Sequence, residues 1–228
     1  MKRRVLGAAT AVFLACGCGY LPSLRRGALK KADWPQRIID AHLHADFTGK
    51  PAPYSGLPHT LEQLKKETVE TGVVGFVAHT ADLQELIPED RPSLSVFCAG
   101  IDENFSREAL ENGLQSGRYG CVKIYLGYVH RYAYDDFYAP VYELAEKYAV
   151  PVVFHAGDAS SDKAKLKYDD PLTIDEVAVD HPKVSFVIAH IGYPWWQSAA
   201  EVAYKNKNVY LDGSGILAGD LTGLSAFD

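Results

Sequence analysis

The chain alternates short, apolar, β-rich runs with stretches of helical spacing, and this alternation constrains its fold more than any other feature. Runs such as "VPVVFHA" and "VSFVIAH" are apolar on both faces, as parallel strands covered by helices must be. The predicted strands are 37–42, 73–78, 94–99, 119–125, 151–155, 184–189 and 208–212. The predicted helices are 60–71, 82–87, 106–116, 138–149, 173–180 and 195–205. Strand and helix in repeated alternation predict an α/β fold with a parallel sheet.

Two architectures with parallel sheets compete, the open doubly wound sheet and the closed TIM-like (β/α)8 barrel. No glycine-rich phosphate-binding turn follows the first predicted strand, where "DAHLHADF" stands instead, so a dinucleotide-binding sheet is disfavoured. Polar residues fall at the carboxyl ends of the strands, where barrel enzymes concentrate their function. These residues are His42, His44, His79, Asp102, Lys123, His155, His190 and Asp212. We therefore predict a (β/α)8 barrel that is incomplete at its C-terminus, because only seven strands can be counted.

The N-terminal stretch "MKRRVLGAATAVFLACGC" has a basic start, an apolar run and then small residues with cysteine. This pattern predicts a signal peptide over residues 1–18, a linker over residues 19–36 and a barrel domain over residues 37–228. The stretch also resembles a bacterial lipoprotein signal, with Cys16 and Cys18 as candidates for lipidation. An ordinary secretory signal and an uncleaved anchor are the alternatives. We expect an exported domain on the periplasmic or cell-surface side of a bacterial membrane, held there by a lipid anchor.

The charge of the chain argues against one class of partner. With 23 lysine and arginine residues against 29 aspartate and glutamate residues, the formal net charge is −6. There is no basic stripe that would neutralise the phosphates of a nucleic acid. We therefore expect a small-molecule substrate and no nucleic-acid partner, while the sequence leaves oligomer formation open.

Two further cysteines, Cys98 in "LSVFCAG" and Cys121 in "GCVKIY", lie in strand-like runs that could be neighbours in one sheet. An exported protein meets an oxidising compartment, so a disulfide is one possibility. Adjacent parallel strands seldom present the geometry that a disulfide needs, and free cysteine is often buried. We therefore expect two free, buried thiols.

The first predicted strand ends in "IIDAHLHAD", which places His42 and His44 two residues apart. Side chains two apart on a strand point the same way, so both imidazoles can approach one ion. Imidazole nitrogens bind zinc and other first-row divalent metals at neutral pH. One such pair is a weak signal, but His155 and His190 at later strand ends strengthen it. Asp40 has the same parity and is a candidate to brace the pair from behind.

Five segments, taken in order, resemble the amidohydrolase-related superfamily: "DAHLHAD", "VKIYLGY", "VPVVFHAGD", "VSFVIAHIGYPWW" and "NKNVYLDGSG". The branch with the greatest likeness contains uncharacterised metal-dependent hydrolases and the aminocarboxymuconate semialdehyde decarboxylase group. The likeness covers about residues 37–216, and the ordered set is far more specific than any one motif. The resemblance implies a barrel with a metal-dependent active site at the carboxyl ends of its strands.

The resemblance also implies roles for individual residues. His42, His44 and His155 match metal ligands, and we expect one divalent metal, zinc, to be the cofactor. His190 matches a histidine that contacts the substrate or the metal-bound water, or binds a second metal; we assign it a catalytic role in stabilising the oxyanion. Lys123 matches a lysine that is carboxylated in some members and binds substrate unmodified in others, and we assign it a catalytic role too.

One expected feature of the family is missing. The remaining ligand or base in such enzymes is an aspartate at the end of the eighth strand, in a Gly-Thr/Ser-Asp setting, and this sequence has no such segment. Asp212 belongs to the seventh predicted strand and is not given that role. Three histidines can still hold a metal, but the carboxylate that would orient the attacking water is lacking.

Three further residues, Tyr125, Asp158 and Trp195, are candidates for binding the substrate. Asp158 could instead fix an imidazole tautomer or cap a turn or helix. Trp195 begins a predicted helix, so it either packs on the barrel or walls the pocket.

Some of the histidines also have simpler interpretations. His155 and His190, taken singly, could be core histidines with satisfied hydrogen bonds. His79 and His130 remain ambiguous, because one follows a strand and the other lies in the tyrosine-rich loop "YVHRYAYDDFY".

The sequence thus predicts a metal-dependent hydrolase, in which metal-activated water attacks an amide, ester or lactone-like bond of a small molecule. One alternative keeps the site and changes the reaction to non-oxidative decarboxylation of a small unsaturated or aromatic acid. Another is a non-catalytic binding lipoprotein or an inactive fragment, which the missing eighth strand favours.

Overall fold

The computed structural model describes residues 38–44, 47–50, 60–79, 94–159 and 161–215. Seven strands run through these segments: β1 (Ile38–Leu43), β2 (Val73–Ala78), β3 (Val96–Ile101), β4 (Cys121–Tyr125), β5 (Val152–His155), β6 (Phe186–Ile188) and β7 (Val209–Leu211). Each strand pairs in parallel with the next one along the chain, so the sheet runs in the order β1 to β7. All the carboxyl ends therefore lie at the same end of the sheet.

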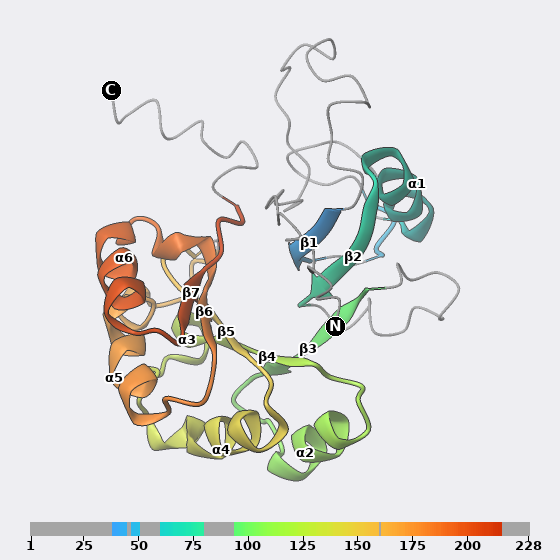
Figure 1. Ribbon diagram of the computed structural model, residues 1–228. Coiled ribbons are helices and arrows are strands. Elements are labelled where there is room, and N and C mark those ends of the chain that lie inside the picture. The colour runs from blue at the N-terminus through green and yellow to red at the C-terminus, as the bar shows by residue number, and fades with distance from the viewer. Residues whose placement is uncertain (1–37, 45–46, 51–59, 80–93, 160, 216–228) are drawn as a thin grey trace, which may run out of the picture.

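Helices follow the strands: α1 (Leu61–Thr71), α2 (Arg107–Gln115), α3 (Leu126–Val129), α4 (Ala139–Tyr148), α5 (Leu172–Asp180) and α6 (Trp196–Lys205). Helices α2, α4, α5 and α6 lie along the outer face of the sheet (Figure 1). The sheet curves, and within the described residues no eighth strand joins β7 to β1. The predicted fold, an incomplete (β/α)8 barrel, is confirmed.

Local sequence signals explain where two of the helices begin or end. The hydroxyl of Thr60 accepts a hydrogen bond from the backbone N–H of Gln63 at 3.1 Å, which caps the start of α1. Gly72 ends that helix in the left-handed conformation, with φ at 79°. Ser106 caps α2 by accepting from the N–H of Ala109 at 3.3 Å. These caps and turns return the chain to the amino end of the next strand.

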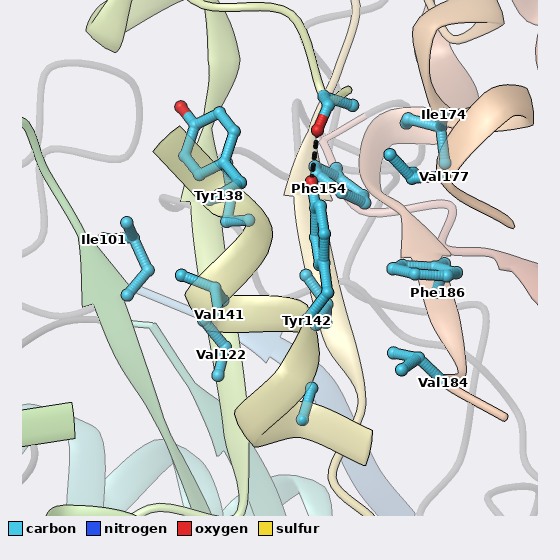
Figure 2. Close-up of a cluster of buried hydrophobic side chains, with 14 of the residues drawn as sticks. Ile101, Val122, Tyr138, Val141, Tyr142, Phe154, Ile174, Val177, Val184 and Phe186 are labelled. Carbon is cyan, nitrogen blue, oxygen red and sulfur yellow. Dashed lines mark hydrogen bonds between the residues drawn. The ribbon is translucent and has the colours of Figure 1, made fainter. Parts of the chain in front are cut away.

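The two faces of a strand meet different surroundings, as β4 shows. Val122 and Ile124 belong to the main hydrophobic core, between the sheet and the helices. Residues Ile101, Val122, Tyr138, Val141, Tyr142, Phe154, Ile174, Val177, Val184 and Phe186 of this core appear in Figure 2. The hydroxyl of Tyr142 donates to the carbonyl of Ala133 at 2.6 Å, so this ring is buried without losing its hydrogen bond. Alternation along the strand leaves Lys123 on the opposite, concave face.

The two internal cysteines form a disulfide, so the expectation of free thiols is wrong. Cys98 on β3 and Cys121 on β4 are direct partners in the parallel register, with Cα atoms 4.3 Å apart. Both side chains point to the concave face, where they pack with Val153 and Ala189. Neighbouring parallel strands in general seldom suit a disulfide. Here the bond forms because Cys98 and Cys121 are direct partners in the register and lie on the same face of the sheet.

The predicted boundaries agree with the structure to within two residues for every described strand and helix that was predicted. The single turn α3 was not predicted. Several predictions lie outside the described residues: the helix 82–87, the signal peptide 1–18, the linker 19–36, and the lipidation of Cys16 or Cys18. None of the helices in the described part of the chain is long and apolar enough to cross a membrane.

Candidate functional site

Five histidines gather at the carboxyl end of the sheet, although they come from four strands. They are His42 and His44 at the end of β1, His79 directly after β2, His155 at the end of β5, and His190 in the 3₁₀ segment Ala189–Gly192 after β6. The ring centroid of His42 lies 4.1 Å from that of His79, 5.0 Å from His44 and 5.1 Å from His190. The structure thus brings together the three predicted metal ligands and the predicted catalytic histidine, whose roles remain predictions.

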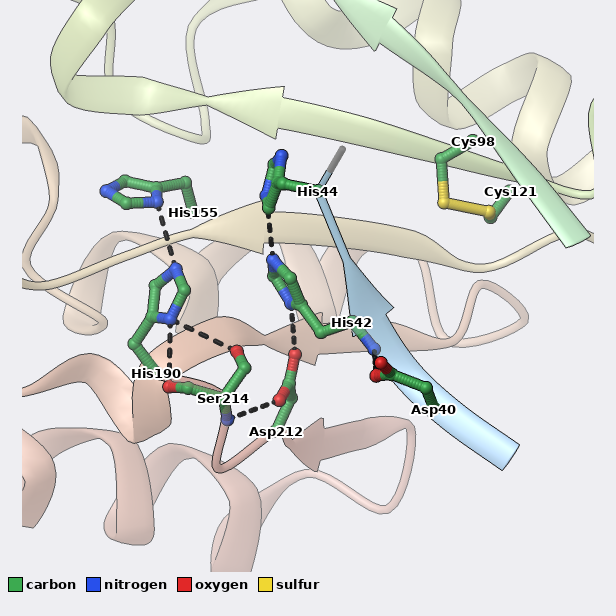
Figure 3. A network of polar contacts seen from close by, with 9 residues as sticks. All are labelled: Asp40, His42, His44, Cys98, Cys121, His155, His190, Asp212 and Ser214. Carbon is green, nitrogen blue, oxygen red and sulfur yellow. Dashed lines mark hydrogen bonds and ion pairs between the residues drawn. A yellow bond between two sulfur atoms is a disulfide. The ribbon is translucent and has the colours of Figure 1, made fainter. Parts of the chain in front are cut away.

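The pair on β1 points one nitrogen of each ring at the other. The Nε2 atoms of His42 and His44 lie 3.0 Å apart (Figure 3). Nδ1 of His42 contacts a carboxylate oxygen of Asp212, which stands directly after β7. Asp40 accepts a hydrogen bond from the backbone N–H of His42 at 3.0 Å, and this contact braces the strand.

The second pair is formed by His155 and His190, and its protonation can be deduced. Nε2 of His155 lies 2.9 Å from the carbonyl oxygen of Asp158, and Nδ1 of His190 lies 3.0 Å from that of Ser214. A carbonyl oxygen only accepts hydrogen bonds, so these two nitrogens carry the protons. The other nitrogens, Nδ1 of His155 and Nε2 of His190, face each other at 3.1 Å.

The electrostatics of the cluster favour neutral rings. Burial lowers the pKa of His155 to about 3 and that of His44 to about 4. Burial also lowers the pKa of His42, His79 and His190, and the neighbouring Lys123 lowers each of them further. In the pair of His155 and His190, two lone pairs therefore face each other with no proton between them, an arrangement that a cation bound at Nδ1 of His155 would relieve.

The donor set fits a divalent metal ion by its chemistry. Neutral imidazoles are ligands for zinc and related metals, and the inward-facing nitrogens of the partly buried His155 and His190 have no donor between them. Among the described residues, however, no three His, Cys, Asp or Glu side chains form a finished metal-binding group. The ring nitrogens face each other in pairs instead of converging on one point. The cluster therefore agrees with a metal site in the type of its donor atoms and in their proximity.

Lys123 reaches the same cluster from the middle of β4. The side chain is fully buried, and its Nζ atom has no hydrogen-bond partner among the described residues. Burial lowers its pKa to about 7, while the nearby Asp212 acts in the opposite direction. Nζ also lies 5.5 Å from the centroid of the Tyr125 ring. An amine that changes charge near neutral pH is suited to bind an oxyanion, which agrees with its predicted catalytic role without testing it.

Tyr125, a predicted substrate-binding residue, connects two parts of the cluster. Its hydroxyl donates to the backbone carbonyl of His79 at 3.2 Å, and its ring stacks on that of His155 at 6.1 Å. Burial raises its pKa to about 12, so the phenol keeps its proton. Tyr128 meets the ring of His155 edge-on at 5.2 Å. These contacts orient His155, and a role of Tyr125 in binding substrate remains a prediction.

The other two predicted substrate-binding residues lie nearby. Asp158 holds Nε2 of His155 through its backbone carbonyl, while its side chain is exposed. Trp195 is half-buried at the start of α6, where its backbone N–H donates to the carbonyl of Gly192 at 2.7 Å. Their predicted contacts with substrate are untested.

Sequence reasoning missed Ser214 and left two histidines undecided. Ser214 binds Nδ1 of His190, and the run "DGSG" directly after a strand was the available signal. His79 is buried within the cluster, and neither ring nitrogen has a hydrogen-bond partner in the described part of the chain. His130 lies elsewhere, where its Nε2 donates to the carbonyl of Lys163 at 2.9 Å.

A comparison with protein families agrees with this geometry. A family profile described as "Amidohydrolase" matches residues 39–227. The chain belongs to this amidohydrolase family. No curated protein sequence matches it.

Solved structures share the barrel. An uncharacterised TIM-barrel protein from Bordetella bronchiseptica has a TM-score of 0.66 at 22% identity, over 84% of this chain and 79% of that chain. A probable 2-pyrone-4,6-dicarboxylic acid hydrolase from Acinetobacter baumannii has a TM-score of 0.54 at 15% identity, over 79% and 71%. The 5-carboxyvanillate decarboxylase of Sphingomonas paucimobilis has a TM-score of 0.54 at 12% identity, over 80% and 82%. At these identities the likeness establishes the fold alone.

Proposed function

We propose that the chain is a metal-dependent hydrolase in which His42, His44 and His155 hold one divalent metal ion, zinc being the ion that imidazole donors favour here. The observation that carries the proposal is the partly buried pair of His155 and His190. Their inward nitrogens face each other at 3.1 Å while their outward nitrogens donate to backbone carbonyls. Membership of the amidohydrolase family supports an enzyme.

The proposed reaction is the addition of water to the carbonyl carbon of an ester, lactone or amide. A bound divalent metal would polarise the carbonyl and lower the pKa of a coordinated water. The carbon–oxygen or carbon–nitrogen bond then breaks, and the proton lost by water ends on the leaving group. His190 is suited to move this proton, because its inward Nε2 is unprotonated and its Nδ1–H is held by Ser214.

This assignment changes the role that the sequence suggested for His190. A neutral ring whose N–H points outward has no proton to donate to an oxyanion on its inward side. Lys123 is the better candidate for that role, because its amine is buried beside the cluster and has no partner among the described side chains. We therefore propose His190 as the proton acceptor and Lys123 as the oxyanion donor.

Metal analysis tests the proposal. We expect the purified protein to bind about one zinc or cobalt ion per chain. The double variant His42→Ala/His44→Ala should lose that ion, whereas His130→Ala, which removes an imidazole outside the cluster, should keep it. Removing the metal with a chelator should abolish hydrolysis of a panel of esters, lactones and amides, and adding it back should restore activity. Equal metal content in the wild type and the double variant would overturn the proposal.

Decarboxylation of a small acid is the second candidate, and Lys123 is the observation that favours it. A buried amine without a hydrogen-bond partner among the described residues suits a substrate carboxylate, and the carboxylate of Asp212 is already engaged by His42 and Ser214. Release of carbon dioxide without net uptake of water would select this reaction. Metal binding without turnover of either substrate class would instead indicate a binding protein.

A further inference from the structure

The turn that follows β7 connects two of the clustered histidines. Asp212 is the first residue after the strand, and Ser214 lies two residues further along. We propose that this Asp212–Ser214 turn is a positioning element that fixes the tautomers of His42 and His190, so that Nε2 of both rings is unprotonated and faces the interior of the cluster. The proposal rests on the proposed function only where it concerns metal binding.

Asp212 acts on the first ring. Its side chain is buried, and both carboxylate oxygens are engaged. Oδ1 accepts from the backbone N–H of Ser214 at 2.7 Å, and Oδ2 contacts Nδ1 of His42 (Figure 3). A carboxylate accepts hydrogen bonds, so Nδ1 of His42 carries the ring proton. The atom left without a proton is Nε2, which faces His44.

Ser214 acts on the second ring. Its backbone carbonyl accepts from Nδ1 of His190 at 3.0 Å, and its hydroxyl lies 3.1 Å from the same nitrogen. Nε2 of His190 is therefore the unprotonated atom, and it faces His155 (Figure 3). Because the N–H of Ser214 is bound to Asp212, one short turn carries the contacts that set both rings.

Backbone hydrogen bonds hold the turn against the end of β6. The N–H of Asp212 donates to the carbonyl of Ile188 at 2.9 Å, and its own carbonyl accepts from the N–H of Ile191 at 2.8 Å. Between these two bonds the chain passes through His190 and Ile191 at positive φ, 59° and 42°, which side chains of this kind rarely adopt. A rare backbone conformation persists only where its surroundings hold it. Here they hold His190 facing the turn.

The consequence for metal binding follows from the chemistry of imidazole. A ring binds a metal through its unprotonated nitrogen, so a wrong tautomer places an N–H where the lone pair is needed. Partners that fix the other nitrogen of a ligating histidine typically account for about 10- to 100-fold in metal affinity. Asp212 would supply such a partner for His42, a proposed ligand, while Ser214 holds the ring of His190, the proposed proton acceptor.

Nitrogen-15 NMR of the histidine rings in the metal-free protein tests the tautomers directly. In the wild type we expect Nδ1 of His42 to be protonated and Nε2 to be unprotonated. Asp212→Asn preserves the shape of the side chain, and its oxygen can still accept from Ser214. Its amide nitrogen then donates to Nδ1 of His42, so the ring proton should move to Nε2, while His190 keeps its tautomer. A wild-type His42 protonated on Nε2, or an unchanged His42 in Asp212→Asn, would overturn the proposal.

Affinity for Zn²⁺, measured by competition with a chromophoric chelator, tests the consequence. We expect Asp212→Asn to bind Zn²⁺ about 10- to 100-fold more weakly than the wild type. The matched control Asp136→Asn makes the same change at an exposed aspartate outside the cluster and should stay within about threefold. Equal affinity of Asp212→Asn and the wild type would overturn the role of the turn in metal binding. If the wild type binds no Zn²⁺, the proposed function fails, whereas the NMR result still decides the tautomers.

Discussion

Lys123 is an exceptional lysine, because a buried amine is normally paired with a carboxylate. The one nearby carboxylate that raises its pKa, that of Asp212, has both oxygens engaged by His42 and Ser214. The pKa of about 7 means that the side chain gives up its charge near neutral pH. Such a position costs stability and is expected where the amine serves function.

We expect Lys123→Met to raise the free energy of unfolding at about pH 6, by up to about 5 kcal/mol. The pKa of the amine is about 7 when folded and 10.5 when unfolded, so the unfolded chain binds the proton more tightly. The penalty is therefore fully present below about pH 7 and disappears as the pH rises toward 10.5. The gain from methionine should shrink over the same range in urea unfolding experiments.

The exposed Lys207 offers a matched control, since Lys207→Met removes an amine that is already in water. This variant should show no comparable gain at about pH 6. A loss of stability in Lys123→Met at that pH would contradict the expectation. It would indicate that the amine has a partner or a covalent modification in the native protein.

The side chains of the site were predictable where their position follows from strand parity. His42, His44, His155 and His190 stand at strand ends, and parallel strands bring such ends together. Their hydrogen-bond partners were not predictable, because those depend on where a turn places a backbone carbonyl. Ser214 is the example: its carbonyl, rather than its hydroxyl alone, binds His190.

The segments that follow β4 and β5 are connected through Asp169. Its Oδ1 accepts from the N–H of Gly127 in α3 at 2.7 Å, and its backbone carbonyl accepts from the N–H of Gly157 at 2.8 Å. A side chain at position 127 would overlap this carboxylate, so glycine is required there. Asp169 therefore ties the turn near Tyr125, through its carboxyl group, to the loop after His155, through its backbone carbonyl. Burial raises its pKa to about 7.

Comparison of the wild type with Asp169→Asn should show that ionisation of the buried Asp169 carboxyl group opposes folding. The pKa is about 7 when folded and 3.8 when unfolded, so the folded state holds the proton more tightly. The stability that the protonated Asp169 carboxyl group contributes is therefore fully present below pH 3.8. It is lost as the pH rises through about 7. Asparagine keeps the acceptor for Gly127 and does not ionise.

Urea unfolding at about pH 5 and about pH 8 measures this effect. Relative to Asp169→Asn, the wild type should lose about 3 kcal/mol between the two conditions. The exposed Asp136→Asn serves as the control and should show no such loss. A difference between wild type and Asp169→Asn that stays constant with pH would contradict the expectation.

The elements were more predictable than the contacts between them. The short apolar runs predicted β1 to β7 correctly. Strands that pack against helices are apolar along most of their length, which distinguishes them from the helical stretches between them. The single turn α3 was missed, since "LGYV" continues an apolar strand without a helical period. The disulfide of Cys98 and Cys121 was missed because register, which sequence does not state, decides it.

The cluster of histidines joins two parts of the molecule that have separate cores. Strands β1 and β2 pack on a small core of Leu43, Phe76, Ala78 and Phe97, distinct from the large core under β3 to β7. Asp212 and His42 connect the two ends of the sheet, where the described residues contain no eighth strand. This contact between side chains links the ends of β1 and β7, and it depends on the charge of the His42 ring.

Histidines and Asp169 respond to acid in opposite directions. Burial lowers the pKa of His42, His44, His79, His155 and His190 from 6.5, so below that pH the unfolded chain binds more protons than the folded one. Their contribution to stability is present above pH 6.5 and is lost as the pH falls. Asp169 has the reverse sign, because its pKa is raised. Five groups outweigh one, so the metal-free protein should be destabilised by acid.

Near pH 5.5, unfolding lets the five histidines take up protons, while the carboxyl group of Asp169 releases one. The net uptake on unfolding is about four protons. The free energy of unfolding should then fall by about 5 kcal/mol for each pH unit at most, since each proton contributes about 1.4 kcal/mol. Calorimetric unfolding of chelator-treated protein in buffers of different ionisation enthalpy measures this uptake. His155→Gln should reduce it by about one proton, and His130→Ala, outside the cluster, should not. Proton release at this pH would show that the imidazoles are charged in the folded protein, contrary to the neutral pairs on which the proposed metal site depends.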